Sequence, residues 1–362
     1  MFFLPRALPS SPVEYHQLGA GEERRWWRVL LGLVVFLLIA LSLTLLIQVV
    51  PFFFTNPVKL AAQFSKMMEG TVDLNQPLVF VIAMLSLVAL IPAAVIATMV
   101  GLRIRPGYLF SVAGHLRWGW LLTCLGLAAL IYLPVHSFSS FVLGSATFNP
   151  VRNLPLVLVL VVVLVPLQSA AEEITFRGYL AQALGALLPW RFVSLAVTIV
   201  LSAALFAAAH GSFHLSTFAA LAIMAIMMVL LTWYTGGLEG AIAIHALHNT
   251  SIFLISALTG PTDSLVNQNT NIGLVPLLTM TALDGTATAL IAWVWKRRQG
   301  QRRHDPKRNP VPTLAYLAKE YSRGRIYPQY RHLYPPAMQA QLWGTPTTEP
   351  SLLNPEEDPH EL

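Results

Sequence analysis

Residues 154–177 read LPLVLVLVVVLVPLQSAAEEITFR, an apolar run that leads directly into two adjacent carboxylates and an arginine. These three side chains are Glu172, Glu173 and Arg177. An ionised side chain at the centre of a lipid bilayer costs at least ~2.5–3.5 kcal/mol on insertion scales. In so apolar a stretch, the three must pair with one another, face a water-filled cavity or take part in chemistry. This segment is therefore the first place to look for a functional site.

The composition of the chain is that of a membrane protein. Only 11% of the 362 residues are charged and 55% are hydrophobic, and the mean hydropathy is +0.61, whereas a soluble domain carries about 25% charged residues. The single cysteine, Cys124, excludes a disulfide framework and a cysteine-based metal cluster. The net charge of +6 does not indicate nucleic-acid binding, because the basic residues cluster at the ends of apolar segments. We predict a polytopic protein that has the lipid bilayer, and not nucleic acid, as its partner.

Eight segments are long enough to cross the membrane, since a helix needs about 20 apolar residues to span the hydrocarbon. We therefore predict an all-α transmembrane bundle of about eight spans. The first run has 22 uncharged residues, longer than the usual core of a signal peptide, and we expect it to be retained. The predicted spans are 29–50, 78–100, 118–135, 154–185, 192–210, 216–234, 239–258 and 273–295.

The basic residues predict the orientation of the bundle. Eight spans place both termini on one side, and arginine and lysine concentrate on that side. We predict an integral multi-pass protein of the cell (inner) membrane with both termini in the cytoplasm. The cytoplasmic basic residues are Arg24, Arg25, Arg28, Arg103, Arg105, Arg117, Arg191, Lys296, Arg297, Arg298, Arg302 and Arg303, against Lys59, Lys66 and Arg152 on the other side.

The chain divides into five parts by composition. Residues 1–28 form a cytoplasmic N-terminal segment, 29–150 accessory transmembrane helices, 151–260 the core and 261–296 the last transmembrane helix. Residues 297–362 are rich in Arg, Lys, Pro and Tyr and lack sustained periodicity, so we predict a largely disordered cytoplasmic tail.

The first motif separates its charges by helical geometry. Glu173 and Arg177 are four residues apart, in the acid-before-base order that favours an ion pair on a helix. Glu172 is turned about 100° away and has no sequence-local partner. Glu172 is therefore the candidate general base. The alternative is that all three charges form a salt-bridge network that only fixes helix packing.

Two later motifs supply histidines. The fifth span ends in FAAAH, from Phe206 to His210, and the seventh contains HALHN, in which His245 and Asn249 share a helical face with His248 close to it. In an antiparallel helix pair, His210 comes within about 6 Å of the depth of the carboxylates. Ideal helices do not bring His245 to that depth, because it lies only five residues after the turn at 236–240; tilt, a bend or unwinding must supply the difference.

We expect three further polar side chains to have structural positions and no catalytic role. We expect Asp284 in the eighth span to be packed among small neighbours and hydrogen-bonded to a partner helix. His136 lies near a span end, where an interfacial position is expected, and Glu239 lies at the cytoplasmic turn, where a charge costs little.

The three motifs together resemble those of a known family. The order E-E-x-x-x-R, F-x-x-x-H and H-x-x-x-N on successive membrane helices is similar to that of the CPBP family of intramembrane proteases. This family, also called Abi, is named for CAAX prenyl proteases and bacteriocin-processing enzymes and includes the Rce1-type CAAX endopeptidase. The resemblance covers about residues 154–258.

The resemblance implies roles for individual residues. Glu172 matches the catalytic glutamate and His210 the second-motif histidine, and together they would activate the attacking water. His245 and Asn249 would stabilise the oxyanion or help to hold the water. The supporting residues are Glu173, Arg177 and Phe206.

The mechanism has two readings that the sequence leaves open. A carboxylate and two histidines are ligand types of a catalytic zinc site, which gives Glu172, His210 and His245 as a candidate zinc set, and zinc would make a bound water nucleophilic near neutral pH. The alternative is a metal-independent glutamate mechanism, because a ligating Glu172 is poorly suited to act as the base and H-E-x-x-H is absent.

We predict an intramembrane (metallo)endopeptidase, a hydrolase that acts on a membrane-associated peptide or protein, with CAAX-type prenylated proteins as one substrate class. One alternative is a non-catalytic membrane scaffold or immunity-type protein of the same fold. Another is a proton- or ion-coupled transporter, in which buried carboxylates and histidines bind ions.

Overall fold

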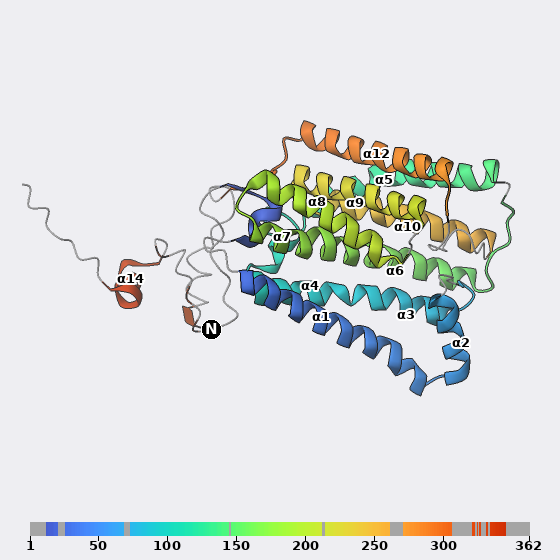
Figure 1. Cartoon of the computed structure of the whole chain (residues 1–362), viewed down its shortest axis with the longest axis horizontal. Helices are drawn as coiled ribbons and strands as arrows, with labels where there is room; N and C mark the ends of the chain where they lie inside the picture. Colours follow the sequence, from blue (N-terminus) through green and yellow to red (C-terminus); the bar gives the residue numbers. More distant parts are fainter. Residues whose placement is uncertain are drawn as a thin grey trace, which may run out of the picture. The chain divides into compact units, whose positions relative to one another are not determined.

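The computed structural model describes residues 12–305, apart from 21–25, 69–72, 145, 212–213 and 261–270, and parts of 321–344. Within these residues the chain is a helical bundle (Figure 1), and eight of its helices are long and apolar enough to cross a membrane. The predicted all-α bundle of about eight spans is therefore confirmed, and the chain is an integral multi-pass membrane protein. The spans are Trp26–Phe53, Pro77–Leu102, Trp118–Leu143, Leu154–Leu187, Arg191–Ala209, Leu215–Thr235, Glu239–Thr259 and Leu274–Arg297.

Several spans are built from more than one helical piece. Those that are single α-helices are α8 (Arg191–Ala209), α9 (Leu215–Thr235), α10 (Glu239–Thr259) and α12 (Leu274–Arg297). The first span combines α1 (Trp26–Val49) with η2 (Val50–Phe53). The second combines α3 (Pro77–Val88) with α4 (Leu90–Ala97) and η3 (Thr98–Leu102), and the third combines α5 (Trp118–Phe138) with η5 (Ser139–Leu143). The amphipathic helix α2 (Pro57–Met68) lies between the first two spans and was not predicted.

The long fourth span changes its helical type at the charged motif. It consists of α6 (Leu154–Glu173), the π-helical turn η6 (Ile174–Leu180) and α7 (Ala181–Leu187). The π-helical turn begins directly after Glu173, so the carboxylates and Arg177 lie on opposite sides of the change. Such π-turns are rare and occur frequently at functional sites.

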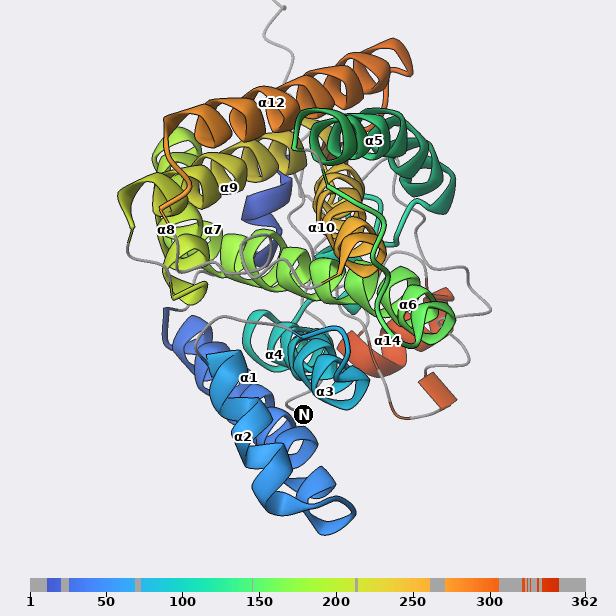
Figure 2. The same ribbon diagram turned by 90° about the vertical axis from the view of Figure 1, so that its right-hand side faces the viewer.

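Helix α10 lies at the centre of the arrangement. Its most extensive contacts are with α6 on one side and α5 on another, as Figure 2 shows. Helices α8 and α9 pack together and α12 covers α9, while α1 packs against α4 and η3 on the other side of α6. Gly32 and Gly101 allow that last contact, because a Cβ added to Gly101 would lie 2.6 Å from the Cα of Gly32.

The turn between α9 and α10 is buried within the protein. Gly236 ends α9 in the left-handed conformation (φ 68°). The loop before α5 covers the turn. The backbone N–H of Val112 donates to the oxygen of Gly236 (2.8 Å), and that of Leu238 donates to the oxygen of Phe110 (2.9 Å). Helix α10 therefore begins inside the protein.

Glu239 differs from its expectation. Its side chain is fully buried at the start of α10, where we had expected a site of little cost for a charge. Arg117 compensates it through a bidentate pair, Nη2 to Oε2 at 2.6 Å and Nε to Oε1 at 2.8 Å. Such charge-assisted forked pairs are among the strongest protein hydrogen bonds.

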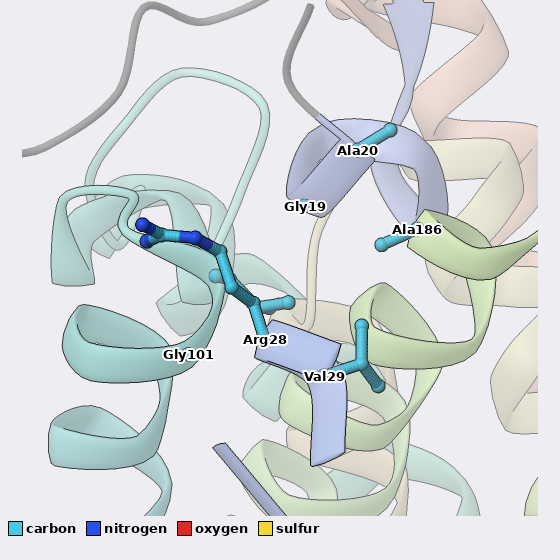
Figure 3. A pocket seen from close by; sticks show the side chains of 7 residues that line it. Gly19, Ala20, Arg28, Val29, Gly101 and Ala186 are labelled. Carbon is cyan, nitrogen blue, oxygen red and sulfur yellow. The ribbon is translucent and has the colours of Figure 1, made fainter. Parts of the chain in front are cut away.

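The N-terminal segment docks on the helix ends that we predict to be cytoplasmic. Strand β1 (Val13–Glu14) pairs antiparallel with β2 (Arg303–His304), and the 3₁₀ helix η1 (Tyr15–Ala20) is buried against α7. Figure 3 shows a recess at the junction of this segment with α1, η3 and α7, lined by Gly19, Ala20, Arg28, Val29, Gly101 and Ala186. The predicted tail 297–362 thus begins with ordered residues.

The carboxylate of Glu14 joins β1 to α8, α9 and β2, and we call these contacts the Glu14 junction. It accepts hydrogen bonds from Trp233 Nε1 at 2.7 Å and Arg303 Nη2 at 3.2 Å, and it pairs with Arg191. Burial raises the pKa of Glu14, but the bonds from Arg191 and Trp233 outweigh it and hold the pKa below its ordinary value. Burial lowers the pKa of His16 and of His304.

The remaining tail is described only in part. Disorder is predicted for residues 297–362, and most of these lie outside the described residues. Most of residues 1–28 also lie outside them. Within the described part, helix α14 (Pro336–Trp343) was not predicted. Tyr334 is buried there against Met338, Leu342 and Trp343.

Candidate functional site

The carboxylates of the first motif are buried at the end of α6. Glu173 and Arg177 are fully buried, and Glu172 is 6% exposed. Arg177 Nη1 donates to Glu173 Oε1 at 3.0 Å, so the predicted i,i+4 pair is present. Breaking such a buried pair is costly, since one charge would be left uncompensated.

His245 lies between the two carboxylates. Its Nδ1 donates to Glu173 Oε1 at 2.8 Å, and its Nε2 is 3.6 Å from Glu172 Oε2. His245 reaches this depth because α10 begins inside the protein. The second distance is too long for a direct hydrogen bond. Glu173 is therefore shared by Arg177 and His245, while the facing oxygen of Glu172 is left for another group.

Two polar residues one turn before the carboxylates complete this side of the site. Gln168 Nε2 donates to Glu172 Oε1 at 2.6 Å. Asn249 Nδ2 donates to Ser169 Oγ at 3.3 Å and lies 3.5 Å from Gln168 Oε1. Gln168 and Ser169 are not among the site residues predicted from the sequence. The spacing could have indicated Gln168, because it lies four residues before Glu172 and so shares its face.

Phe206 is the apolar centre of the site. Its ring is fully buried, with the guanidinium of Arg177 over it at 4.2 Å and the ring of His245 at 5.8 Å. The ring of His210 lies 4.5 Å away on the same helix. From α8, this supporting residue thus contacts the other two spans that carry the motifs.

His210 lies at the edge of the site. It caps the end of α8 and is partly exposed, like Asn249 and unlike the buried Glu172, Glu173 and His245. Its Nδ1 donates to the backbone oxygen of Phe206 at 2.8 Å, which leaves Nε2 as the nitrogen able to accept a proton. Although both residues are described, no hydrogen bond or ion pair joins His210 to Glu172. The two can act on one group only if that group lies between them.

The candidate zinc set has suitable donor atoms but not a suitable arrangement. The donor types suit zinc, because His210 and His245 both donate a hydrogen bond from Nδ1 and keep Nε2 available to bind a metal. Their placement does not: among the described residues, no three His, Cys, Asp or Glu side chains are grouped so that they could hold a metal ion. This placement favours the metal-independent alternative, and zinc ligation by Glu172, His210 and His245 stays a prediction from the sequence alone.

Comparison with known proteins agrees with the order of the motifs. Residues 152–251 match the family described as Rce1-like type II CAAX prenyl endopeptidases. Residues 152–251 are similar to this family, and we call them the Rce1-like segment. The predicted family resemblance is confirmed there, and the Rce1-like segment contains all three motifs, from α6 to the middle of α10. No curated protein and no solved structure was found that matches the chain.

Proposed function

We propose that the chain is an intramembrane endopeptidase that hydrolyses a peptide bond of a membrane-associated substrate, with CAAX-type prenylated proteins or peptides as the substrate class. The observation that carries the proposal is the placement of Glu172. One of its oxygens is fixed by Gln168 and the other faces His245 Nε2 across 3.6 Å. The match of residues 152–251 to a family of prenyl endopeptidases supports the reaction class.

Glu172 is the proposed general base. Glu173 is neutralised by Arg177, so Glu172 is the carboxylate of the pair that is left to accept a proton. A water held between Glu172 Oε2 and His210 Nε2 gives its proton to Glu172, while its oxygen attacks the scissile carbonyl carbon. The partly exposed position of His210 suits a residue that meets water and substrate together.

The tetrahedral intermediate carries a negative oxygen that needs hydrogen-bond donors. We assign this role to Asn249 Nδ2, whose present bonds of 3.3 and 3.5 Å are weak enough to be exchanged. His245 is the second donor, through Nε2 when both ring nitrogens carry a proton. Preorganised donors of this kind supply much of the rate enhancement in acyl transfer.

The intermediate collapses when the C–N bond breaks. The leaving amine nitrogen receives the proton that Glu172 took from water, which returns Glu172 to its ionised state. The products are a carboxylate and an amine, and neither Glu173 nor Arg177 exchanges a proton. Their proposed role is to hold His245 in position.

We also propose that both termini face the cytoplasm of a cell (inner) membrane. The basic residues near the ends of the described spans support this orientation. It would place the Glu14 junction and β2 on the cytoplasmic side.

Purified protein in proteoliposomes tests the proposal. We expect it to cleave a farnesylated CAAX peptide in H₂¹⁸O with one ¹⁸O atom incorporated into the new carboxylate. The matched control is the same peptide without the prenyl group. Equal cleavage of both peptides would support the endopeptidase activity but would overturn the CAAX-type substrate class. No hydrolysis of either peptide, or of a panel of membrane-protein reporters, would favour the non-catalytic scaffold.

A further inference from the structure

A second group of buried polar side chains lies on the other side of α10. It comprises Tyr132 and His136 on α5, His248 and Ser251 on α10, and Asp284 on α12, and we call it the α5–α10–α12 cluster. Tyr132, His248, Ser251 and Asp284 are each at most 5% exposed. Polar groups placed so deeply in spanning helices are costly, so the cluster requires an explanation.

The bonds of the cluster join all three helices. Tyr132 donates its hydroxyl to Asp284 Oδ1, and His248 Nδ1 is 3.6 Å from the same oxygen. Ser251 donates to the backbone oxygen of His248 at 2.8 Å, so its hydroxyl oxygen must accept from His136 Nδ1, at 2.6 Å. Asp284 is thus packed and hydrogen-bonded as predicted, whereas His136 is not the isolated interfacial residue that we had expected.

The rings of the cluster also pack closely. The centroids of Tyr132, His136 and His248 are 5.3–5.6 Å apart, and all three pairs meet edge to face. Two side chains of α5, Tyr132 and His136, thus contact His248 of α10. The cluster is therefore a continuous link between helices and not a set of separate contacts.

Helix α10 carries two polar stripes. On an ideal helix, Asn249 lies about 40° from His245 in one direction, whereas His248 and Ser251 lie about 60° and 120° from it in the other. The first stripe contacts the carboxylates and Ser169 of α6, and the second contacts α5 and α12. The proposed catalytic groups and the α5–α10–α12 cluster therefore share one rigid element.

Such bonds help to set the rotation of α10. Helices in a bilayer are held together by van der Waals packing and by interhelical hydrogen bonds, and the bonds require each polar stripe to face its partner helix. A rotation of about 20° moves a side-chain atom about 5 Å from the axis by about 2 Å. Misplacement on the order of 1 Å costs about 10²-fold in rate. A small turn of α10 would therefore disable His245 and Asn249 together.

Three members of the cluster come from outside the Rce1-like segment. Tyr132, His136 and Asp284 precede or follow the matched residues 152–251. We infer that the α5–α10–α12 cluster is a positioning network, in which α5 and α12 fix the rotation of α10 and so place His245 and Asn249 against α6. The catalytic consequence of this inference rests on the proposed function, whereas the positioning of α10 is independent of it. The cluster residues are positioning residues and do not touch the reacting atoms.

Cross-linking tests the position of α10 without any need for activity. In a Cys124→Ser background, Ser169→Cys and Asn249→Cys replace two side chains that touch at 3.3 Å, and oxidation joins them. Adding Asp284→Leu is expected to slow disulfide formation about fivefold, the factor that corresponds to ~1 kcal/mol. The matched control is Thr286→Val, two residues away on the exposed face of α12.

A milder variant and a kinetic measurement complete the test. Should Asp284→Leu fail to fold, Tyr132→Phe removes one hydroxyl and is expected to slow cross-linking about threefold. In the otherwise unaltered chain, both variants are expected to lower kcat while KM is unchanged, because substrate contacts are kept. Unchanged cross-linking rates would overturn the positioning network even in an active protease. Slowed cross-linking in a protein that cleaves nothing would support the network and reject the proposed function.

Discussion

Replacement of Arg177 by methionine should destabilise the protein far more than replacement of Glu172 by glutamine. Arg177 and Glu173 are both fully buried and 3.0 Å apart, and His245 shares the same carboxylate oxygen. Removing one partner of such a pair costs about 3–5 kcal/mol, because the other charge stays buried without compensation. Glu172→Gln removes a charge that has no cationic partner as close as this, and a glutamine at 172 can still bond to Gln168.

The assay is reversible unfolding in mixed micelles, followed by circular dichroism and compared with the double variant Glu173→Gln/Arg177→Met. We expect the double variant to be at least about 1 kcal/mol more stable than the sum of the two single changes predicts, since residues in one network are not additive. A loss below about 1 kcal/mol for Arg177→Met, or additive single changes, would refute the view of this pair as a compensated buried charge.

Two further predictions concern the Glu14 junction and the metal. Because the folded-state pKa values of Glu14, His16 and His304 are all lowered, their contribution to stability is present at neutral pH and is lost as pH falls. The histidine contribution decreases below the ordinary histidine pKa of 6.5, and the contribution of Glu14 decreases below its ordinary pKa of 4.5. Protection of residues 12–20 from hydrogen exchange should therefore decrease between pH 7 and pH 4; constant protection would contradict the assignment. Because the described side chains do not group around a metal, purified protein should contain no stoichiometric zinc by mass spectrometry, whereas one zinc per chain would show that α8 moves to bring His210 to His245.

The sequence could predict the spans and the pairing within one helix. Length and hydropathy determine which segments cross a bilayer, and helical periodicity determines that Glu173 meets Arg177. The order of the motifs also indicated which helices carry the site. Phe206 was selected only as part of a motif, but the structure shows why an aromatic ring belongs there: it contacts Arg177, His210 and His245.

The depth of His245 could not be predicted, since it depends on contacts far away in the chain. The loop before α5 covers the turn at 236–240, and Arg117 compensates the charge of Glu239 inside the protein. Nothing local to the turn reveals such a partner. Glu239 looked like a surface charge for the same reason.

The α5–α10–α12 cluster was missed for a related reason. Tyr132, His136 and Asp284 are isolated polar residues on separate apolar helices, and only the packing of α5 and α12 against α10 brings them to His248. The docking of η1 was hidden as well, because a short 3₁₀ segment has no periodicity that a sequence pattern can detect.

The central claim is that Glu172 is the base of a hydrolytic reaction. The most direct measurement is kcat for cleavage of a reporter peptide by Glu172→Gln relative to the unaltered protein, with the unfolding free energy of both determined in the same preparation. Glutamine keeps the shape and the bond to Gln168 but cannot accept a proton from water. We predict a fall in kcat of about 10²–10⁴-fold with little change in stability. Equal kcat in the folded variant would contradict the account.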